Sequence, residues 1–167
     1  WWFAFNLAND RPLLGGGANA FTQELFYAYA PEPERHHDAH SIYFEILGEQ
    51  GYPGLMIFMA LLFFSFRNCV WVRKMSKNVP EAKWAYDLSR MLQASFVAYG
   101  VGGAFLGLAY FDLLYHLMAL TVLLRVVVVK ELQQGLVMTT QNKAASHGQS
   151  ESIAKKRPFG EKRSSAI

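Results

Sequence analysis

The chain has 167 residues, of which 52% are hydrophobic and 17% are charged, and its formal net charge is +3. The apolar residues are gathered in long blocks instead of at the spacing of a soluble core, which is typical of a membrane protein. The single cysteine, Cys69, excludes an intramolecular disulfide, and no cysteine and histidine residues have zinc-ligand spacing. We expect no metal site, no cofactor and no nucleic-acid partner.

The first segment predicts a helix over residues 1–9 that Pro12 ends, followed by a turn at Gly15-Gly16-Gly17. The turn lacks the lysine and the serine or threonine of a phosphate-binding loop, so a plain turn is the favoured interpretation. The chain opens with Trp1 and without a basic leader, and we expect it to be a C-terminal fragment. A proline-rich connector over 30–35 separates this part from the next predicted helix.

That helix begins at Asp38 as N-cap, holds Ala39, His40 and Ser41 in its first turn, and ends at Gly51. Unpaired N–H groups in a first turn favour anions and disfavour an imidazolium ion. His40 would then stay neutral and able to accept a proton. Two interpretations remain open at this point: His40 is a general base, or it merely caps the helix or lies at the membrane interface.

Three segments, 54–72, 92–111 and 113–129, approach the roughly 20 apolar residues that cross a bilayer. We predict a transmembrane helix in each, within a membrane region over 53–130. Arg125 lies close to the end of its span, where a long basic side chain reaches the headgroups.

Charge orients these spans. Residues 1–52 hold two basic and seven acidic residues, whereas 73–90 holds five basic and two acidic ones, and the segment from 130 onward holds seven and three. By the positive-inside rule, residues 1–52 face outward, and the later two segments face the cytoplasm. The tail over 131–167 is polar and aperiodic, which predicts disorder.

The second and third spans would then join on the outer side, near Asp112. Polar groups at such a turn, with His116 among them, would line the same site as His40. A solvated turn with interfacial aromatic residues is the alternative interpretation.

The run from Asp38 to Leu55 resembles the signature of the bacterial O-antigen ligase and polymerase superfamily, a histidine followed by Asn, Ser or Gln, nine residues, and Gly-x-x-Gly. Here the matching residues are His40, Ser41, Gly51 and Gly54. The Pro12–Gly17 turn, Phe21 and the 109–113 turn are similar to the O-glycosylation ligases associated with exosortase systems. The resemblance covers residues 1–130.

The resemblance implies an all-α, polytopic membrane enzyme that transfers a glycan from undecaprenyl diphosphate to an acceptor hydroxyl, by inversion and without metal. It implies a multi-pass protein of the bacterial inner membrane whose catalytic side faces the periplasm, with a lipid, glycan or protein as acceptor. By motif match the general base is His40. We expect help in substrate binding from Arg35, Arg11, Ser41 and His116.

The ligases have a motif in which an arginine is followed, after three intervening residues, by a leucine. This motif is absent here, because the fourth residue after Arg11 is Gly15 and the fourth residue after Arg35 is Ala39. The fragment alone should therefore be inactive. Two other functions stay open: a polymerase of the same superfamily, or a non-enzymatic transporter or flippase component in which His40 caps a helix.

Overall fold

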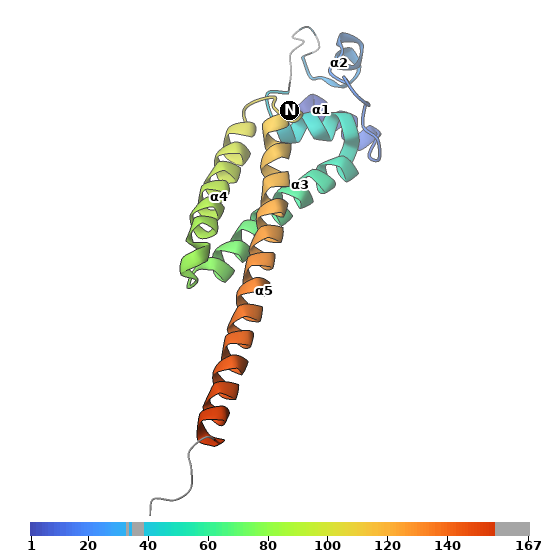
Figure 1. Cartoon of the computed structure of the whole chain (residues 1–167). Helices are drawn as coiled ribbons and strands as arrows, with labels where there is room; N and C mark the ends of the chain where they lie inside the picture. Colours follow the sequence, from blue (N-terminus) through green and yellow to red (C-terminus); the bar gives the residue numbers. More distant parts are fainter. Residues whose placement is uncertain (33, 35–38, 156–167) are drawn as a thin grey trace, which may run out of the picture. The chain divides into compact units, whose positions relative to one another are not determined.

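The computed structural model describes residues 1–32, 34 and 39–155, and every regular element in them is a helix. This confirms the predicted all-α class. The helices are α1 (Trp2–Asp10), α2 (Gln23–Tyr29), α3 (Ile42–Ser76), the short 3-10 helix η1 (Pro80–Ala82), α4 (Lys83–Gly103) and α5 (Asp112–Lys155) (Figure 1). The chain divides into two units, Trp1–Val128 and Val129–Ile167, and the first contains every candidate site residue that the structure describes.

A small apolar core joins α1 and α2. The ring of Phe3 stacks on Phe26 with 4.4 Å between centroids, and Ala4, Leu7 and Ala20 are buried beside them. The prediction of a helix over residues 1–9 is confirmed by α1. Helix α2 was not expected from the sequence, although Thr22 marks its start: the Thr22 hydroxyl accepts from the Leu25 N–H at 3.4 Å.

Helix α3 consists of two segments that meet at Gly51, whose φ of 67° and ψ of −165° interrupt the helix. The predicted end of the first segment at Gly51 is thereby confirmed. The predicted start is wrong. The helix begins at Ile42, because Ser41 is extended and His40 has a φ of 47°, so neither belongs to a first turn. Asp38, the expected N-cap, lies outside the described residues.

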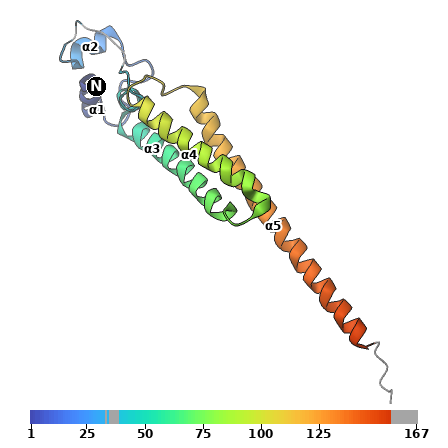
Figure 2. The same ribbon diagram turned by 90° about the vertical axis from the view of Figure 1, so that its left-hand side faces the viewer.

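Helices α3 and α4 pack against each other in opposite directions (Figure 2). At one end the Tyr43 hydroxyl donates to the Gly100 carbonyl at 2.8 Å, and at the other Arg73 donates to the Gln93 side chain at 3.1 Å. A Cβ at Gly103 would lie 2.5 Å from Cδ1 of Ile42, so this glycine permits close helix approach. The segments before α3 and after α4 therefore meet at the same end of the pair.

Helix α5 buries Leu114, Thr121 and Val128 in the first unit. Arg125 donates to Asn68 of α3 at 2.8 Å, and its guanidinium lies 4.8 Å from the centroid of the Trp71 ring. A cation over an indole face is stabilised by the ring quadrupole. The basic group that the sequence placed near the end of a span is thus paired with polar and aromatic groups of α3.

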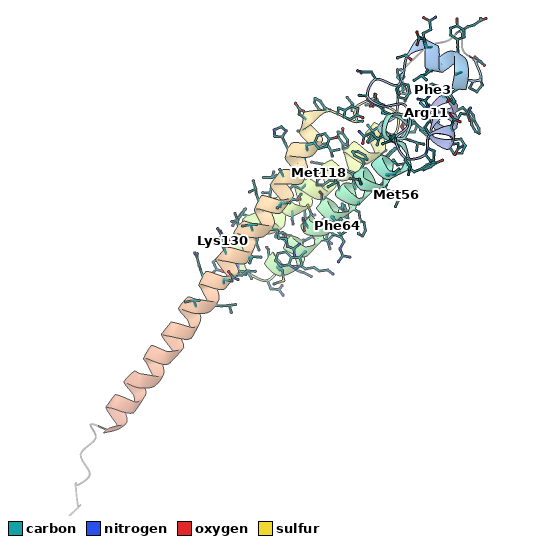
Figure 3. All side chains as sticks on the ribbon, turned by 90° about the vertical axis from the view of Figure 1, so that its right-hand side faces the viewer. Phe3, Arg11, Met56, Phe64, Met118 and Lys130 are labelled. Atoms are coloured by element: carbon teal, nitrogen blue, oxygen red, sulfur yellow. The ribbon has the colours of Figure 1, made fainter. Side chains whose placement is uncertain are left out.

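Two described helices are long and apolar enough to cross a membrane, over Ile42–Ser76 and Asp112–Val137. Their most apolar stretches are only 22% and 28% buried, unlike the core helix of a soluble protein. Met56, Ile57, Phe63 and Phe64 of α3 are all more than half exposed, and Figure 3 labels two of them, Met56 and Phe64. So much exposed apolar surface needs a lipid or protein cover.

The middle predicted span differs most from the structure. Helix α4 runs over Lys83–Gly103, so the predicted boundaries 92 and 111 are both displaced. Residues 104–111 form a series of turns instead. Helix α4 is not one of the two candidate spans, and it carries Lys83, Asp87 and Arg90.

The end of the third predicted span also differs, because α5 continues past residue 129 to Lys155. Residues 131–155, expected to lack regular structure, are helical. They contain no proline and are rich in strong helix formers such as alanine, glutamine, glutamate and lysine. Residues 156–167 lie outside the described part.

Candidate functional site

The glycine-rich turn and the kink in α3 form one structural unit. The amides of Gly16 and Gly17 donate to the carbonyls of Gly48 and Glu49 at 2.8 and 2.9 Å, and the Tyr52 amide donates to the Pro12 carbonyl at 3.0 Å. The first two bonds satisfy carbonyls that the end of the first segment of α3 leaves without intrahelical partners, and the third satisfies an N–H at the start of the second segment. The turn therefore fixes the direction in which the second segment of α3 leaves the first.

Two glycines make this contact possible. Gly15 has a φ of 58°, and a Cβ there would lie 2.5 Å from the Gly48 carbonyl oxygen. Gly51 has a φ of 67°, and its Cβ would lie 2.5 Å from the Pro12 carbonyl oxygen. Both positions need a left-handed backbone and a close backbone approach, which glycine alone supplies without strain.

His40 lies just before α3, with an exposed side chain between two buried neighbours. Ala39 is 8% exposed and Ser41 is 1% exposed, and the Ala39 carbonyl accepts from the Trp1 indole N–H at 2.9 Å. A φ of 47° is uncommon for a residue other than glycine, and such conformations gather at functional sites. The buried neighbours hold the imidazole outward, although outside the first turn where we expected it.

An exposed aromatic surface borders the His40 segment. Trp1 stacks on Phe44 with 5.3 Å between ring centroids, and Trp1, Trp2, Phe5 and Phe44 line an apolar cavity of about 370 Å³. Aromatic residues with a polar edge are favoured where protein, lipid headgroups and water meet.

A larger cavity, of about 730 Å³, lies between the glycine-rich turn, α3 and the 104–111 loop. Its polar lining comes from Asn19, Glu45, Glu49, Gln50 and Tyr110, and its apolar lining includes Leu14 and Phe21. This volume is within the range of about 300–1,000 Å³ that is usual for ligand sites. Segments that are 60 residues apart in the sequence thus share one cavity.

Glu49 holds the walls of this cavity together. One carboxylate oxygen of Glu49 accepts from the backbone N–H of Asn19 at 2.9 Å, and the other accepts from the Tyr110 hydroxyl at 2.5 Å. The Gln50 amide donates to the same Tyr110 hydroxyl at 3.0 Å. Burial, together with the Glu49 carboxylate, raises the pKa of Tyr110 well above its ordinary value, so this hydroxyl stays protonated and donates.

Glu45 ties the same loop to α3 one turn earlier, because its carboxylate accepts from the Ala109 amide at 3.3 Å. The Tyr115 hydroxyl donates to the Ala109 carbonyl at 2.9 Å. The turn that begins at Ala109 is therefore joined to α3 through Glu45, Glu49 and Tyr110. That polar groups of this turn line the same site as His40 stays a prediction.

None of the predicted site residues that the structure describes, His40 included, lines this cavity. Arg11 is exposed at the end of α1, where its guanidinium lies 4.0 Å from the Asp10 carboxylate (Figure 3). The same carboxylate accepts from the Tyr29 hydroxyl at 2.5 Å and raises the pKa of Tyr29. Arg35 lies outside the described residues.

Ser41 is the buried N-cap residue of α3, and its side chain makes no capping hydrogen bond. His116 is exposed in the first turns of α5, where Nδ1 lies 2.7 Å from the Asp112 carbonyl oxygen. A carbonyl only accepts, so Nδ1 carries the hydrogen and Nε2 of the neutral ring is the acceptor. Neither residue lines the large cavity.

Sequence reasoning missed the cavity lining as a site. Glu45 and Glu49 are four residues apart and therefore share a helix face, and Tyr110 stands out as an aromatic residue at an outer turn. Those two signals are distant in the sequence, which does not indicate that a hydrogen bond joins them.

The N-terminal part of the chain matches a known family. Residues 1–59 match the family model described as O-antigen ligase. The match covers α1, the glycine-rich turn, α2, His40 and the kink at Gly51, but less than half of the chain. O-antigen ligases are enzymes that act on lipid-linked glycans. No curated protein and no solved structure was found to match the chain. Association with an exosortase system stays a prediction.

Proposed function

We propose that this chain carries the periplasmic catalytic histidine of an O-antigen ligase-like membrane glycosyltransferase. The observation that carries the proposal is the placement of His40 within the segment that matches the O-antigen ligase model. There the imidazole is exposed, and it is presented by a strained backbone between buried neighbours.

In the proposed reaction, His40 removes the proton from an acceptor hydroxyl. The hydroxyl oxygen attacks the anomeric carbon of the glycan, the bond from that carbon to the phosphate oxygen breaks, and undecaprenyl diphosphate leaves with the electron pair. The attack comes from the face opposite the leaving group, so the configuration is inverted. A positioned base of this kind contributes about 10²- to 10⁴-fold to the rate.

The surroundings of His40 support a lipid-linked donor. The aromatic surface of Trp1, Trp2, Phe5 and Phe44 begins where Trp1 bonds the backbone of Ala39. The exposed apolar residues of α3 begin after Gly51. A carrier whose diphosphate lies at the headgroup level would place its anomeric carbon beside such a histidine. Arg11 and Arg35 are proposed helpers for the diphosphate, since a guanidinium suits a phosphate pair.

The test is the variant His40→Asn in the intact protein. Asparagine tolerates a left-handed backbone better than alanine does, so the variant removes the base without adding strain. We expect transfer to fall at least about 100-fold at an unchanged membrane level, whereas Gln23→Ala on the exposed surface of α2 keeps full activity. The assay measures loss of glycosylated acceptor and accumulation of undecaprenyl-linked glycan.

The products also separate the competing functions. A ligase moves the glycan off the carrier onto another acceptor, while a polymerase leaves a longer glycan on the carrier. If His40→Asn transfers at the wild-type rate, His40 is not the base and another group must activate the acceptor. Absence of transfer by the wild-type protein itself would favour the transporter or flippase interpretation.

A further inference from the structure

The cavity of about 730 Å³ beside the glycine-rich turn has no part in the chemistry proposed for His40. It is lined by the first segment of α3, the segment that follows His40 in the chain. At about 1.5 Å of rise per residue, Glu45 and Glu49 lie roughly 5 and 10 Å along the helix from its first residue. His40 stands two residues before that start. A molecule reacting at His40 could therefore extend into the cavity.

The charges of the lining exclude the diphosphate of a lipid-linked donor from this cavity. Glu45 and Glu49 bring two carboxylates, and no lysine, arginine or histidine lines the cavity among the described residues. A diphosphate there would face two like charges without a counter-ion. The cavity therefore suits a neutral or cationic ligand, and the diphosphate belongs elsewhere.

The remaining groups suit many hydroxyls at once. Glu45, Glu49 and the Gln50 amide oxygen accept hydrogen bonds, while the side-chain amides of Asn19 and Gln50 also donate. Glu49 uses each oxygen for one bond to the protein, and a carboxylate oxygen can accept two. Leu14 and Phe21 offer apolar surface for the C–H faces of a ring. Mixed acceptors, donors and one aromatic face match a sugar better than a purely apolar molecule.

The lining is also preorganised. The bonds from Asn19 and Tyr110 to Glu49, and from the Ala109 amide to Glu45, hold three chain segments around the space before any ligand enters. A ligand then loses less affinity to the ordering of side chains.

We infer that this cavity is a binding subsite for neutral, hydroxyl-rich sugar residues of the transferred glycan or of its acceptor. The inference rests on the proposed function, because the sugar would be held within reach of His40. The two sources share the same chemistry, and kinetics with each substrate varied in turn distinguish them.

Two variants of the intact protein test the subsite. Glu45→Gln keeps the shape and removes one charged acceptor, and Ala18→Trp fills the cavity from an exposed lining position. The matched controls are Glu24→Gln and Ala28→Trp, which make the same changes on the exposed surface of α2. Transfer is followed while the lipid-linked donor is varied at saturating acceptor, and then the reverse.

We expect Glu45→Gln to raise the KM of one substrate about tenfold, which corresponds to about 1.4 kcal/mol, with little change in kcat. Ala18→Trp should raise the same KM further, and both controls should match the wild type. A higher KM for the donor places the transferred glycan in the cavity, and a higher KM for the acceptor places the acceptor sugar there.

Competing probes separate sugar binding from phosphate binding. The probes are the neutral oligosaccharide released from the carrier and inorganic diphosphate. Glu45→Gln should weaken inhibition by the oligosaccharide and leave inhibition by diphosphate unchanged. Unchanged KM values in both variants, or equal weakening of both inhibitors, would overturn the subsite. If His40→Asn abolishes transfer while the cavity variants behave as wild type, only the subsite is wrong.

Discussion

At the residue scale, the molecule concentrates its unusual features in a few positions. His40 and Asn19 have φ values of 47° and 59°, and both lie at the edges of the unit formed by the glycine-rich turn and α3. Strained conformations persist only where the surroundings over-determine them. Here the buried neighbours of His40 and the bond from the Asn19 amide to Glu49 provide that constraint.

We expect the stability of the protein to depend on pH through Tyr110. Its pKa is raised in the folded protein above the ordinary 10.0, first by burial and then by Glu49. The folded state therefore disfavours the phenolate, so the stability from this group is complete below about pH 10 and falls as the pH rises further. We expect Tyr110→Phe to melt at a lower temperature than the wild type near neutral pH. Its melting temperature should also fall less than that of the wild type as the pH rises above about 10.

Melting curves of detergent-solubilised protein between about pH 7 and pH 11 measure this effect. Tyr27→Phe, on the exposed face of α2, is the matched control. An alkaline decline of equal slope in the wild type and in Tyr110→Phe would show that the bond to Glu49 does not govern this stability.

At the element scale, two motifs that lie far apart in the sequence depend on each other. The turn over 12–17 is bonded to the end of the first segment of α3, and the two glycines with positive φ face each other's backbone. The kink between the first and second segments of α3 is therefore set by the turn as well as by Gly51 itself.

Alanine substitutions separate backbone strain from contact. Gly15→Ala adds a Cβ 2.5 Å from a carbonyl oxygen, whereas Gly17, with a φ of 80°, has nothing within 4 Å of its Cβ position. Left-handed strain alone costs about 1–2 kcal/mol, and overpacking adds about 1–3 kcal/mol. Gly15→Ala should thus lower the melting temperature and the transfer rate clearly more than Gly17→Ala. Equal losses would mean that the turn does not pack on the kink.

The sequence predicted α1, the interruption at Gly51 and the presence of long apolar helices, because proline, glycine and apolar runs act locally. It misplaced the start of α3, since the burial of Ala39 and Ser41 against the N-terminal segment is a tertiary effect. It also missed α2 and the end of α4. Of the proposed site, the motif singles out His40, whose role stays a prediction. The Glu49–Tyr110 bond joins segments 61 residues apart and left no local signal.

At the scale of the whole molecule, the two ends of the α3 and α4 pair differ in charge and in the chain segments that lie there. The segment before α3 and the loop after α4 meet around the large cavity, and the 77–82 connection lies at the other end of the pair. The acidic excess of residues 1–52 and the basic excess of 73–90 then correspond to the two ends. We propose that His40 and the cavity face the periplasm for this reason.

Cysteine labelling tests this orientation most directly, in the intact protein with Cys69→Ala as background. Single cysteines replace Ala28 and Asn78, which are both exposed, whereas Ser76 is buried and unsuitable. With a maleimide that does not cross the inner membrane, we predict labelling of Ala28→Cys in intact cells and of Asn78→Cys only after lysis. Labelling of Asn78→Cys in intact cells, with Ala28→Cys protected until lysis, would place His40 in the cytoplasm and contradict periplasmic glycan transfer.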